Sequence, residues 1–327
     1  MSAVPATTRY TLDELRDAAR CVQAAMAPTP ARRWPLLDAA LGTEVWLKHE
    51  NHTPLGAFKV RGGLVYFARL LDREPDVAGV ICATRGNHGQ SVAYAATRAG
   101  LRSVIVVPHG NSREKNAAMR ALGAELIEHG EDFQEAREHA ERLAAARGLH
   151  LVPSFHDDLV LGVASYALEL FESAGPLDVV YVPIGLGSGI CGTIAARDAL
   201  GLATEIVGVV SAGAPAYARS LAAGRALPHP VSTRIADGMA CRVPEPQALA
   251  IIGAGAAGVV EVSDAEVAAA MRLLFETTHN VAEGAGAAST AAALQARDAL
   301  AGRRVGLILS GGNVDRPLYT AVLAESL

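Results

Sequence analysis

Strand-like and helical segments alternate along most of this 327-residue chain. Short strand-like segments cover residues 43–48, 77–83, 103–108, 124–128, 179–184, 205–210 and 304–310. Amphipathic or Ala-rich segments predict helices that begin after Thr11, end at Arg98, and cover 112–122, 132–147 and 191–200. Short, wholly apolar strands separated by helices are typical of parallel sheets covered on both faces. The pattern predicts an α/β protein whose ligands bind beyond the carboxyl ends of the strands.

Composition narrows the function classes. Half of the residues are hydrophobic and 19% are charged, which allows a sizeable core. The net charge of −5 gives no electrostatic case for nucleic acid, and no apolar run is long enough to span a membrane. Residues 1–6 lack the basic start and apolar centre of a signal peptide. The four cysteines are widely spaced and form no CxxC pair, so we expect a reducing cytoplasm.

The first candidate site is the stretch 48–63, which surrounds Lys59 with apolar residues such as Phe58 and Val60. Burial there would lower the pKa of the amine and make it a nucleophile suited to a Schiff base with a carbonyl. Glycines at 56, 62 and 63 would let other groups approach the backbone. The alternative is a lysine whose stem covers apolar surface while its charge stays in water.

Three loops with unusual composition follow predicted strands. The loop 84–90 precedes a helix, and its backbone N–H groups suit a carboxylate. The loop 183–190 carries alternating glycines before another helix, which favours phosphate, although a tight turn would also use them. It is neither a nucleotide-triphosphate loop nor a dinucleotide fingerprint. The loop 310–313 begins with Ser310, which could also be a helix cap or turn residue.

Together these features indicate a phosphorylated cofactor that carries an aldehyde, such as pyridoxal phosphate. The ordered motifs resemble fold-type II pyridoxal-phosphate enzymes, specifically the threonine/serine dehydratase and serine racemase family. The matching segments are Lys48-x-Glu50, 56–62, 86–90, 185–189 and 310–313. The resemblance implies two open, twisted, mostly parallel sheets flanked by helices. It also implies a large cofactor domain (1–79 and 156–327) and a small domain (80–155) that closes over substrate.

The resemblance also implies roles for individual residues. Lys59 would hold the cofactor as a Schiff base and then act as the base at the substrate Cα. The other cofactor contacts would be Phe58 on the ring, Asn87 on the 3′-oxygen, Ser310 on the pyridine nitrogen, and Gly185, Leu186, Gly187, Ser188 and Gly189 on the phosphate. The residues expected near the substrate carboxylate are Thr84, Arg85, Gly86, Asn87 and His88. A serine at the pyridine nitrogen makes the ring a weaker electron sink, which favours elimination over transamination.

The implied reaction converts a β-hydroxy amino acid of the L-threonine or L-serine type to a 2-oxo acid and ammonia by α,β-elimination. A racemase is a further alternative, but the family's second proton donor is replaced here by Arg85, which cannot exchange a proton. Arg85 could face solvent or pair with a second carboxylate, which would make 3-hydroxyaspartate the substrate. A β-replacement synthase would favour a different sequence at 84–87. A non-catalytic cofactor-binding protein would be expected to lose Lys59 or the glycine loop.

Other departures from the family concern the cofactor phosphate, metal and regulation. Ala57 replaces the usual serine near the cofactor phosphate. Residues 211–216 contain no carboxylate where many members bind a divalent cation, so we expect no divalent metal there. Asp237 and Glu283 match family segments near the site, although Glu283 could equally be a first-turn helix carboxylate. The chain ends shortly after Asn313, so we expect no regulatory domain, and a homodimer is the family expectation.

Overall fold

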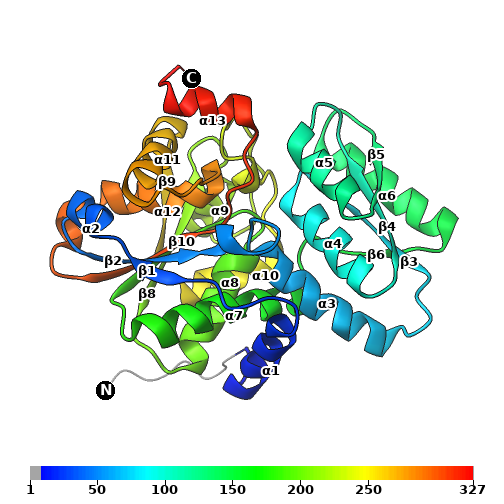
Figure 1. Cartoon of the computed structure of the whole chain (residues 1–327), viewed down its shortest axis with the longest axis horizontal. Helices are drawn as coiled ribbons and strands as arrows, with labels where there is room; N and C mark the ends of the chain where they lie inside the picture. Colours follow the sequence, from blue (N-terminus) through cyan, green and yellow to red (C-terminus); the bar gives the residue numbers. More distant parts are fainter. Residues whose placement is uncertain (1–8, 327) are drawn as a thin grey trace.

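The computed structural model describes residues 9–326 and contains a larger and a smaller lobe (Figure 1). Within these residues the strands form a six-stranded sheet in the order β1-β2-β10-β7-β8-β9 and a four-stranded sheet in the order β5-β4-β3-β6. The strands of the first sheet are β1 (Ala31–Arg33), β2 (Glu44–His49), β7 (Val179–Pro183), β8 (Glu205–Ser211), β9 (Gly258–Val262) and β10 (Arg304–Leu309). Those of the second are β3 (Gly79–Ala83), β4 (Arg102–Val107), β5 (Glu125–Glu128) and β6 (His150–Leu151). Every pairing is parallel except β1 with β2. The predicted α/β class with two mostly parallel sheets is confirmed.

Helices cover both sheets. Those packed with the first sheet or near it are α1 (Leu12–Gln23), α2 (Pro35–Leu41), α3 (Lys59–Arg73), α7 (Asp157–Ala174), α8 (Ser188–Ala199), α9 (Ala216–Ala223), α10 (Pro246–Gly255), α11 (Asp264–Thr278), α12 (Gly284–Gln295) and α13 (Arg316–Leu323). Those of the second sheet are α4 (Asn87–Arg98), α5 (Arg113–Ala121) and α6 (Phe133–Arg147). Short 3₁₀ turns lie at Glu50–His52 (η1), Asp237–Met239 (η2) and Arg297–Leu300 (η3).

Alternation along the central strands explains why they are apolar throughout. In β7, Val180 and Val182 face one hydrophobic core, while Val179 and Tyr181 face another. In β3, residues 80 and 82 enter one core, while 81 and 83 enter the core against α6. Successive strand residues point to opposite faces, so a sheet covered on both sides needs apolar residues at every position.

All seven strands predicted from the sequence are present, and no boundary is shifted by more than two residues. The helix predicted to begin after Thr11 is α1. Thr11 caps it, and the Glu14 side chain binds back to the Thr11 backbone, which completes a capping box. The pattern missed β1, β6 and β9. The first two have only three and two residues, with partly exposed side chains, so they carry no apolar run that would mark them.

Parallel pairing brings distant loops together at one edge of the large sheet. Strands β2, β10 and β7 are neighbours, so the segments that follow them lie side by side at their carboxyl ends. These segments contain Lys59, Ser310 and the glycine loop. The loop 84–90 follows β3 in the other sheet. We call residues 79–151, which carry the second sheet, the small lobe, and the remaining described residues the large lobe. The domain limits at 80 and 155 stay a prediction.

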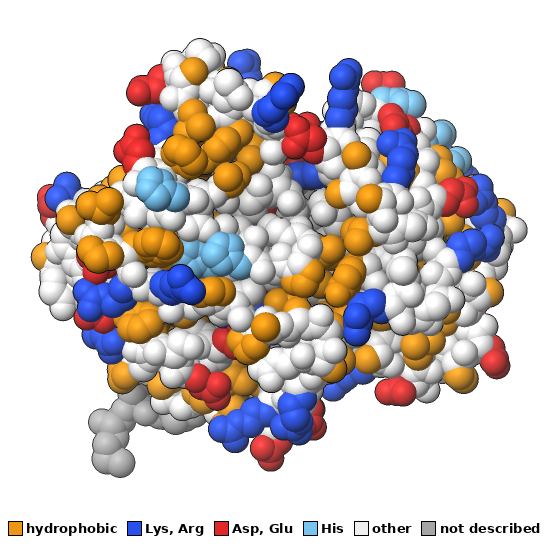
Figure 2. Space-filling view, in the orientation of Figure 1, with side chains coloured by type: hydrophobic (Ala, Val, Ile, Leu, Met, Phe, Trp, Pro, Cys, Tyr) orange, Lys and Arg blue, Asp and Glu red, His pale blue; other side chains and the backbone are white. Residues whose placement is uncertain are grey.

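No helix within residues 9–326 is long and apolar enough to cross a membrane. Residues 1–6, from which the absence of a signal peptide was inferred, lie outside the described part of the chain. The space-filling surface carries charged side chains of both signs around much of its rim and a notch at its upper edge, where the two lobes meet (Figure 2).

Candidate active site

Lys59 is the first residue of α3, directly after the loop that follows β2. Its amine donates a hydrogen bond to the Ser188 hydroxyl at 3.0 Å and lies 4.9 Å from the centre of the Phe58 ring. Burial lowers the pKa of Lys59 to about 8, because the charged form loses hydration. No carboxylate forms an ion pair with it among the described residues. A large fraction of this amine is therefore neutral and nucleophilic near pH 8.

A cluster of buried charges holds the start of α3. Arg61 is fully buried and binds Glu50 at 2.6 Å and Glu169 at 2.8 Å. Glu169 also accepts a hydrogen bond from Lys48 at 2.6 Å, and Thr29 completes the cluster through its backbone and hydroxyl. Two cations and two carboxylates thus neutralise each other inside the protein, two residues beyond Lys59. This is the structural use of the Lys48-x-Glu50 motif.

The glycine loop leads directly into α8, whose first residue is Ser188. Cys191 makes the first backbone hydrogen bond of the helix, to Gly187 at 3.0 Å, so the N–H groups of residues 188–190 point out of its N-terminus. Gly187 has a φ of +99°, which other residues rarely adopt. A Cβ at Gly185 would lie 2.4 Å from the Gly238 carbonyl oxygen. The Leu186 carbonyl accepts a hydrogen bond from Tyr217 at 2.9 Å, which fixes the middle of the loop.

Ser310 lies at the end of β10 and is only 4% exposed. Its carbonyl accepts a hydrogen bond from the Phe58 backbone at 3.0 Å, and the next residue, Gly311, pairs with Ala57. These bonds attach the loop after β10 to the residues just before Lys59. Ser310 does not cap a helix, since α13 begins only at Arg316.

The loop 84–90 is closed by its own threonine. The Thr84 hydroxyl accepts hydrogen bonds from the backbone N–H groups of Gly86 and Gly89 at 3.0 and 3.2 Å. The N–H of Gly86, which we expected to be available to a carboxylate, is thus used within the loop. Arg85 is exposed, and no hydrogen bond or ion pair of its guanidinium is found within residues 9–326. Ala57, which has no side-chain hydroxyl, is held by its backbone: its N–H donates to the Thr53 hydroxyl at 2.9 Å, and its carbonyl accepts from the same hydroxyl at 2.9 Å.

His88 places an unsatisfied polar atom in this loop. Its Nε2 is buried and has no hydrogen-bond partner within the described protein. Burial and, to a smaller degree, the nearby charge of Lys59 lower its pKa to about 3, so the imidazole is neutral at physiological pH. Unsatisfied buried polar groups are rare in native proteins and accompany strain, a catalytic role, or a bound water or ion.

Asn87 connects the small lobe to the large one. Its amide nitrogen donates to Glu283 at 2.6 Å, and its oxygen accepts from Asn313 at 2.9 Å. Glu283 is the N-cap residue of α12, but its side chain makes no capping hydrogen bond and is 2% exposed. Burial raises its pKa, and the nearby Asp237 adds to this effect. The structure therefore brings Asn87, Asp237 and Glu283 together.

The sequence analysis missed Lys115, which binds both acidic residues. Its amine donates to Asp237 at 2.7 Å and to Glu283 at 3.3 Å. One signal was present, because Lys115 precedes the fully buried Met119 by four residues, so both lie on the buried face of α5. Asn313 was named in the sequence analysis only as the end of the segment 310–313, without a role. In the structure its amide donates a hydrogen bond to the Asn87 side chain at 2.9 Å.

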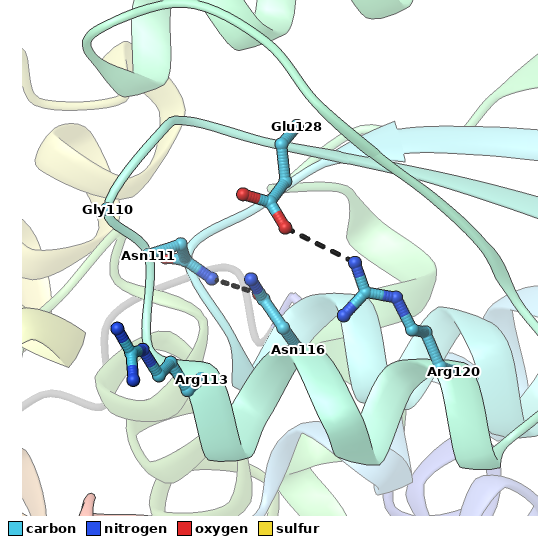
Figure 3. Close-up of a pocket in the computed structure, with 6 residues that line it drawn as sticks. All are labelled: Gly110, Asn111, Arg113, Asn116, Arg120 and Glu128. Atoms are coloured by element: carbon cyan, nitrogen blue, oxygen red, sulfur yellow. Dashed lines mark hydrogen bonds and ion pairs between the residues drawn. The ribbon is translucent and has the colours of Figure 1, made fainter.

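A separate pocket of about 300 Å³ lies in the small lobe (Figure 3) and is lined by Gly110, Asn111, Arg113, Asn116, Arg120 and Glu128. Its polar side chains largely bind one another: Asn111 donates to Asn116 at 2.7 Å and Arg120 to Glu128 at 3.2 Å. None of the predicted site residues lines it. In the part of the chain that the structure describes, no group of three or more His, Cys, Asp or Glu side chains could hold a metal ion.

Known proteins are similar to this chain over most of its length. Residues 22–311 match the family described as pyridoxal-phosphate dependent enzyme. The chain is 33% identical to the L-threonine ammonia-lyase of Thermotoga maritima, over 97% of this chain and 79% of that protein. It is 31% identical to the L-threo-3-hydroxyaspartate ammonia-lyase of Saccharomyces cerevisiae, over 96% of both chains.

Solved structures agree with the sequence comparisons. The processed form of threonine deaminase isoform 2 from Solanum lycopersicum superposes with a TM-score of 0.87 at 28% identity, covering 99% of this chain and 96% of that one. A match over most of the chain, together with relatives above 30% identity, shows the family. The chain belongs to the fold-type II pyridoxal-phosphate dependent enzymes, within the threonine/serine dehydratase family.

Proposed function

We propose that this chain is an ammonia-lyase that removes water from an L-threonine- or L-serine-type amino acid and yields a 2-oxo acid and ammonia. The observation that carries the proposal is the position of Lys59. Its amine has a lowered pKa and lies between the Phe58 ring and Ser188, the first residue of the helix that the glycine loop introduces. This arrangement combines a nucleophile for an aldehyde with an N-terminus for a phosphate.

The residues present fit pyridoxal phosphate. The N–H groups at the start of α8 suit its phosphate. The buried ring nitrogen of His88 has no hydrogen-bond partner among residues 9–326, and a bound ligand could supply one. Lys59 would hold the aldehyde carbon, Phe58 the ring face, Asn87 the 3′-oxygen and Ser310 the pyridine nitrogen. Bound pyridoxal phosphate would capture the substrate amino group and draw electron density from its Cα.

The chain's own groups then determine the outcome. Neutral Lys59 is the base that takes the α-proton at its Nζ, which its lowered pKa permits near pH 8. The Ser310 hydroxyl is neutral and lacks the negative charge with which a carboxylate would stabilise a protonated pyridine nitrogen. Prompt loss of the β-hydroxyl, which takes up a proton and leaves as water, is therefore favoured over a long-lived carbanion. The enamine that leaves hydrolyses to the 2-oxo acid and ammonia.

A second candidate substrate is 3-hydroxyaspartate. The observation that favours it is Arg85, an exposed guanidinium in the loop expected to bind the substrate carboxylate, for which residues 9–326 supply no hydrogen bond or ion pair. Arg85 would pair with the second carboxylate of this diacid. The same residue argues against racemisation, because it cannot exchange a proton from the opposite face of the substrate.

The test is an assay of 2-oxo acid and ammonia from purified holoenzyme with L-threonine, L-serine and the 3-hydroxyaspartate stereoisomers. Lys59→Ala should abolish product with each of them, and turnover by that variant would refute the proposal. Arg85→Ser should reduce kcat/KM for the diacid about tenfold or more relative to threonine if Arg85 binds its second carboxylate. Equal effects on all substrates would exclude that role.

Assembly and compartment are part of the same proposal. We propose a cytoplasmic homodimer, which sedimentation of the holoenzyme and cell fractionation would test. The four cysteines are free, and three of them are buried, which suits a reducing compartment.

A further inference from the structure

The first turn of α5 reaches from the small lobe to three segments of the large lobe. The Ser112 hydroxyl donates to the Asp315 carboxylate. The Glu114 carboxylate accepts from the backbone N–H of Arg316 at 2.9 Å, so it caps the N-terminus of α13 from the other lobe. Lys115 binds Asp237 and Glu283. In Figure 1, α5 lies at the side of the small lobe that faces α13, whereas α4 packs on α3.

Lys115 is buried between the lobes. The residue is 5% exposed, and its stem lies over Gly86, where an added Cβ would come within 2.4 Å of the lysine Cδ. A side chain at residue 86 would therefore displace the lysine or the loop. Burial alone would lower the pKa of Lys115, but Glu283 and Asp237 outweigh it and raise that pKa, so the amine is a cation.

The contact continues from Lys115 to Asn87. One Glu283 oxygen lies 3.3 Å from the Lys115 amine, and the other accepts the Asn87 amide at 2.6 Å. Asn313 holds the opposite side of the same amide. The groups that face the Glu283 carboxylate are thus the cation of Lys115, the carboxylate of Asp237 and the amide of Asn87. Without that cation, a buried carboxylate next to another would take up a proton, and its hydrogen bond with Asn87 would change.

A buried hydrogen bond between two asparagines stabilises the turn that carries Lys115. Asn111, just before the N-cap Ser112, donates to Asn116 at 2.7 Å, and both side chains are buried. Figure 3 shows this bond, with Arg113 of the same turn at the separate pocket. Arg113 is exposed and contacts neither Asp237 nor Glu283, so it offers a matched control that removes one positive charge from the same turn.

We propose that Lys115 is a positioning residue that clamps the small lobe against the large lobe and, through Glu283, orients Asn87 for the elimination. The assignment to the elimination rests on the proposed function, whereas the clamp itself does not. When the lobes separate, Lys115 leaves Glu283, and Asn87 loses its fixed orientation. Closure and correct placement of Asn87 thus occur together.

The experiment compares Lys115→Met, Lys115→Arg, Asp237→Asn and the control Arg113→Met. Hydrogen exchange of residues 84–90 and 110–118 is measured by mass spectrometry on the apoprotein, and kcat and KM are measured on the holoenzyme. Lys115→Met should accelerate exchange in both segments and lower kcat about 10- to 100-fold with a smaller change in KM. Lys115→Arg keeps the positive charge, so its hydrogen exchange and its kcat should lie between those of Lys115→Met and the wild type. Arg113→Met should match the wild type in both.

A double variant that combines Lys115→Met with Glu283→Gln distinguishes a positioning role of Lys115 from a contribution to protein stability alone. If Lys115 acts through Glu283, the kcat of the double variant should be close to that of the worse single variant. Normal kcat in Lys115→Met with lower thermal stability, or full additivity in the double variant, would overturn the proposal. If Lys115→Met does not fold, Asp237→Asn gives the same readouts with a milder change. If no substrate is turned over, the proposed function fails, and exchange in the apoprotein still decides whether the clamp exists.

Discussion

Removing one charge from the buried cluster beneath Lys59 should cost much of the protein's stability. The substitution is Glu169→Gln, which keeps the shape of the side chain. Glu169 accepts four hydrogen bonds: from Lys48 at 2.6 Å, from two nitrogens of Arg61 at 2.8 Å, and from the Thr29 backbone at 3.3 Å. A glutamine would turn an NH₂ group toward some of these donors and leave the cluster with an unpaired positive charge.

The size of this loss of stability follows from the burial of Lys48 and Arg61, the two cations that Glu169 binds. Lys48 and Arg61 are fully buried, and breaking one partner of a buried ion pair costs about 3–5 kcal/mol. For a chain of this length the unfolding entropy is roughly 0.7 kcal/mol per degree, from the typical value per residue. The midpoint of thermal unfolding should therefore fall by about 4–7 °C.

The assay is thermal unfolding of the apoprotein followed by circular dichroism, with Glu141→Gln as the matched control. Glu141 is also a helical glutamate in an ion pair, with Arg137 at 2.9 Å, but both side chains are exposed, so its loss should hardly move the midpoint. Equal shifts for the two variants, or no shift for Glu169→Gln, would refute the reasoning.

The pH dependence gives the same prediction a second test. Burial raises the pKa of Glu169, but Arg61 and Lys48 outweigh it, so the pKa is below its usual value of 4.5. The unfolded chain then binds the proton more readily, and the stabilisation is present above about pH 4.5 and is lost as the pH falls through the lower folded value. The difference in unfolding midpoint between the wild type and Glu169→Gln should therefore become smaller in that acidic range.

Two further predictions concern the cofactor site. The rate at which pyridoxal phosphate attaches to the apoprotein, measured by visible absorbance, should rise with pH through a midpoint near 8. The reason is that burial lowers the pKa of Lys59 to about 8. A midpoint near 10.5, the ordinary lysine value, would contradict the burial of this amine. Gly187→Ala should weaken cofactor binding about tenfold, because φ is +99° and the new Cβ would lie 2.8 Å from the Ala248 side chain. The control Gly201→Ala also has a positive φ, +64°, but its new Cβ would meet open space. This control should leave cofactor affinity unchanged. Equal affinities in titrations of the two apoproteins would contradict a role of the glycine loop.

The sequence by itself predicted most of the strands and the family, and it named most of the candidate site residues that the structure brings together. Fully buried strands need apolar side chains at every position, and a lysine in an apolar glycine-rich stretch is unusual enough to be noticed. The edge strand β1 and the short β6 were missed because their partly exposed side chains carry no such pattern. The motif Lys48-x-Glu50 was visible, but not its partner Glu169, which lies 121 residues beyond Lys48.

Only the tertiary structure decided which groups meet. The order β2-β10-β7 brings the loops after three distant strands to one edge of the sheet and so places Lys59 against Ser188. It also showed that Thr84 uses the N–H of Gly86 within its own loop and that Lys115 crosses between the lobes to Glu283. Hydrophobic periodicity is local and survives in the sequence, whereas the partner of a polar side chain depends on how the lobes pack.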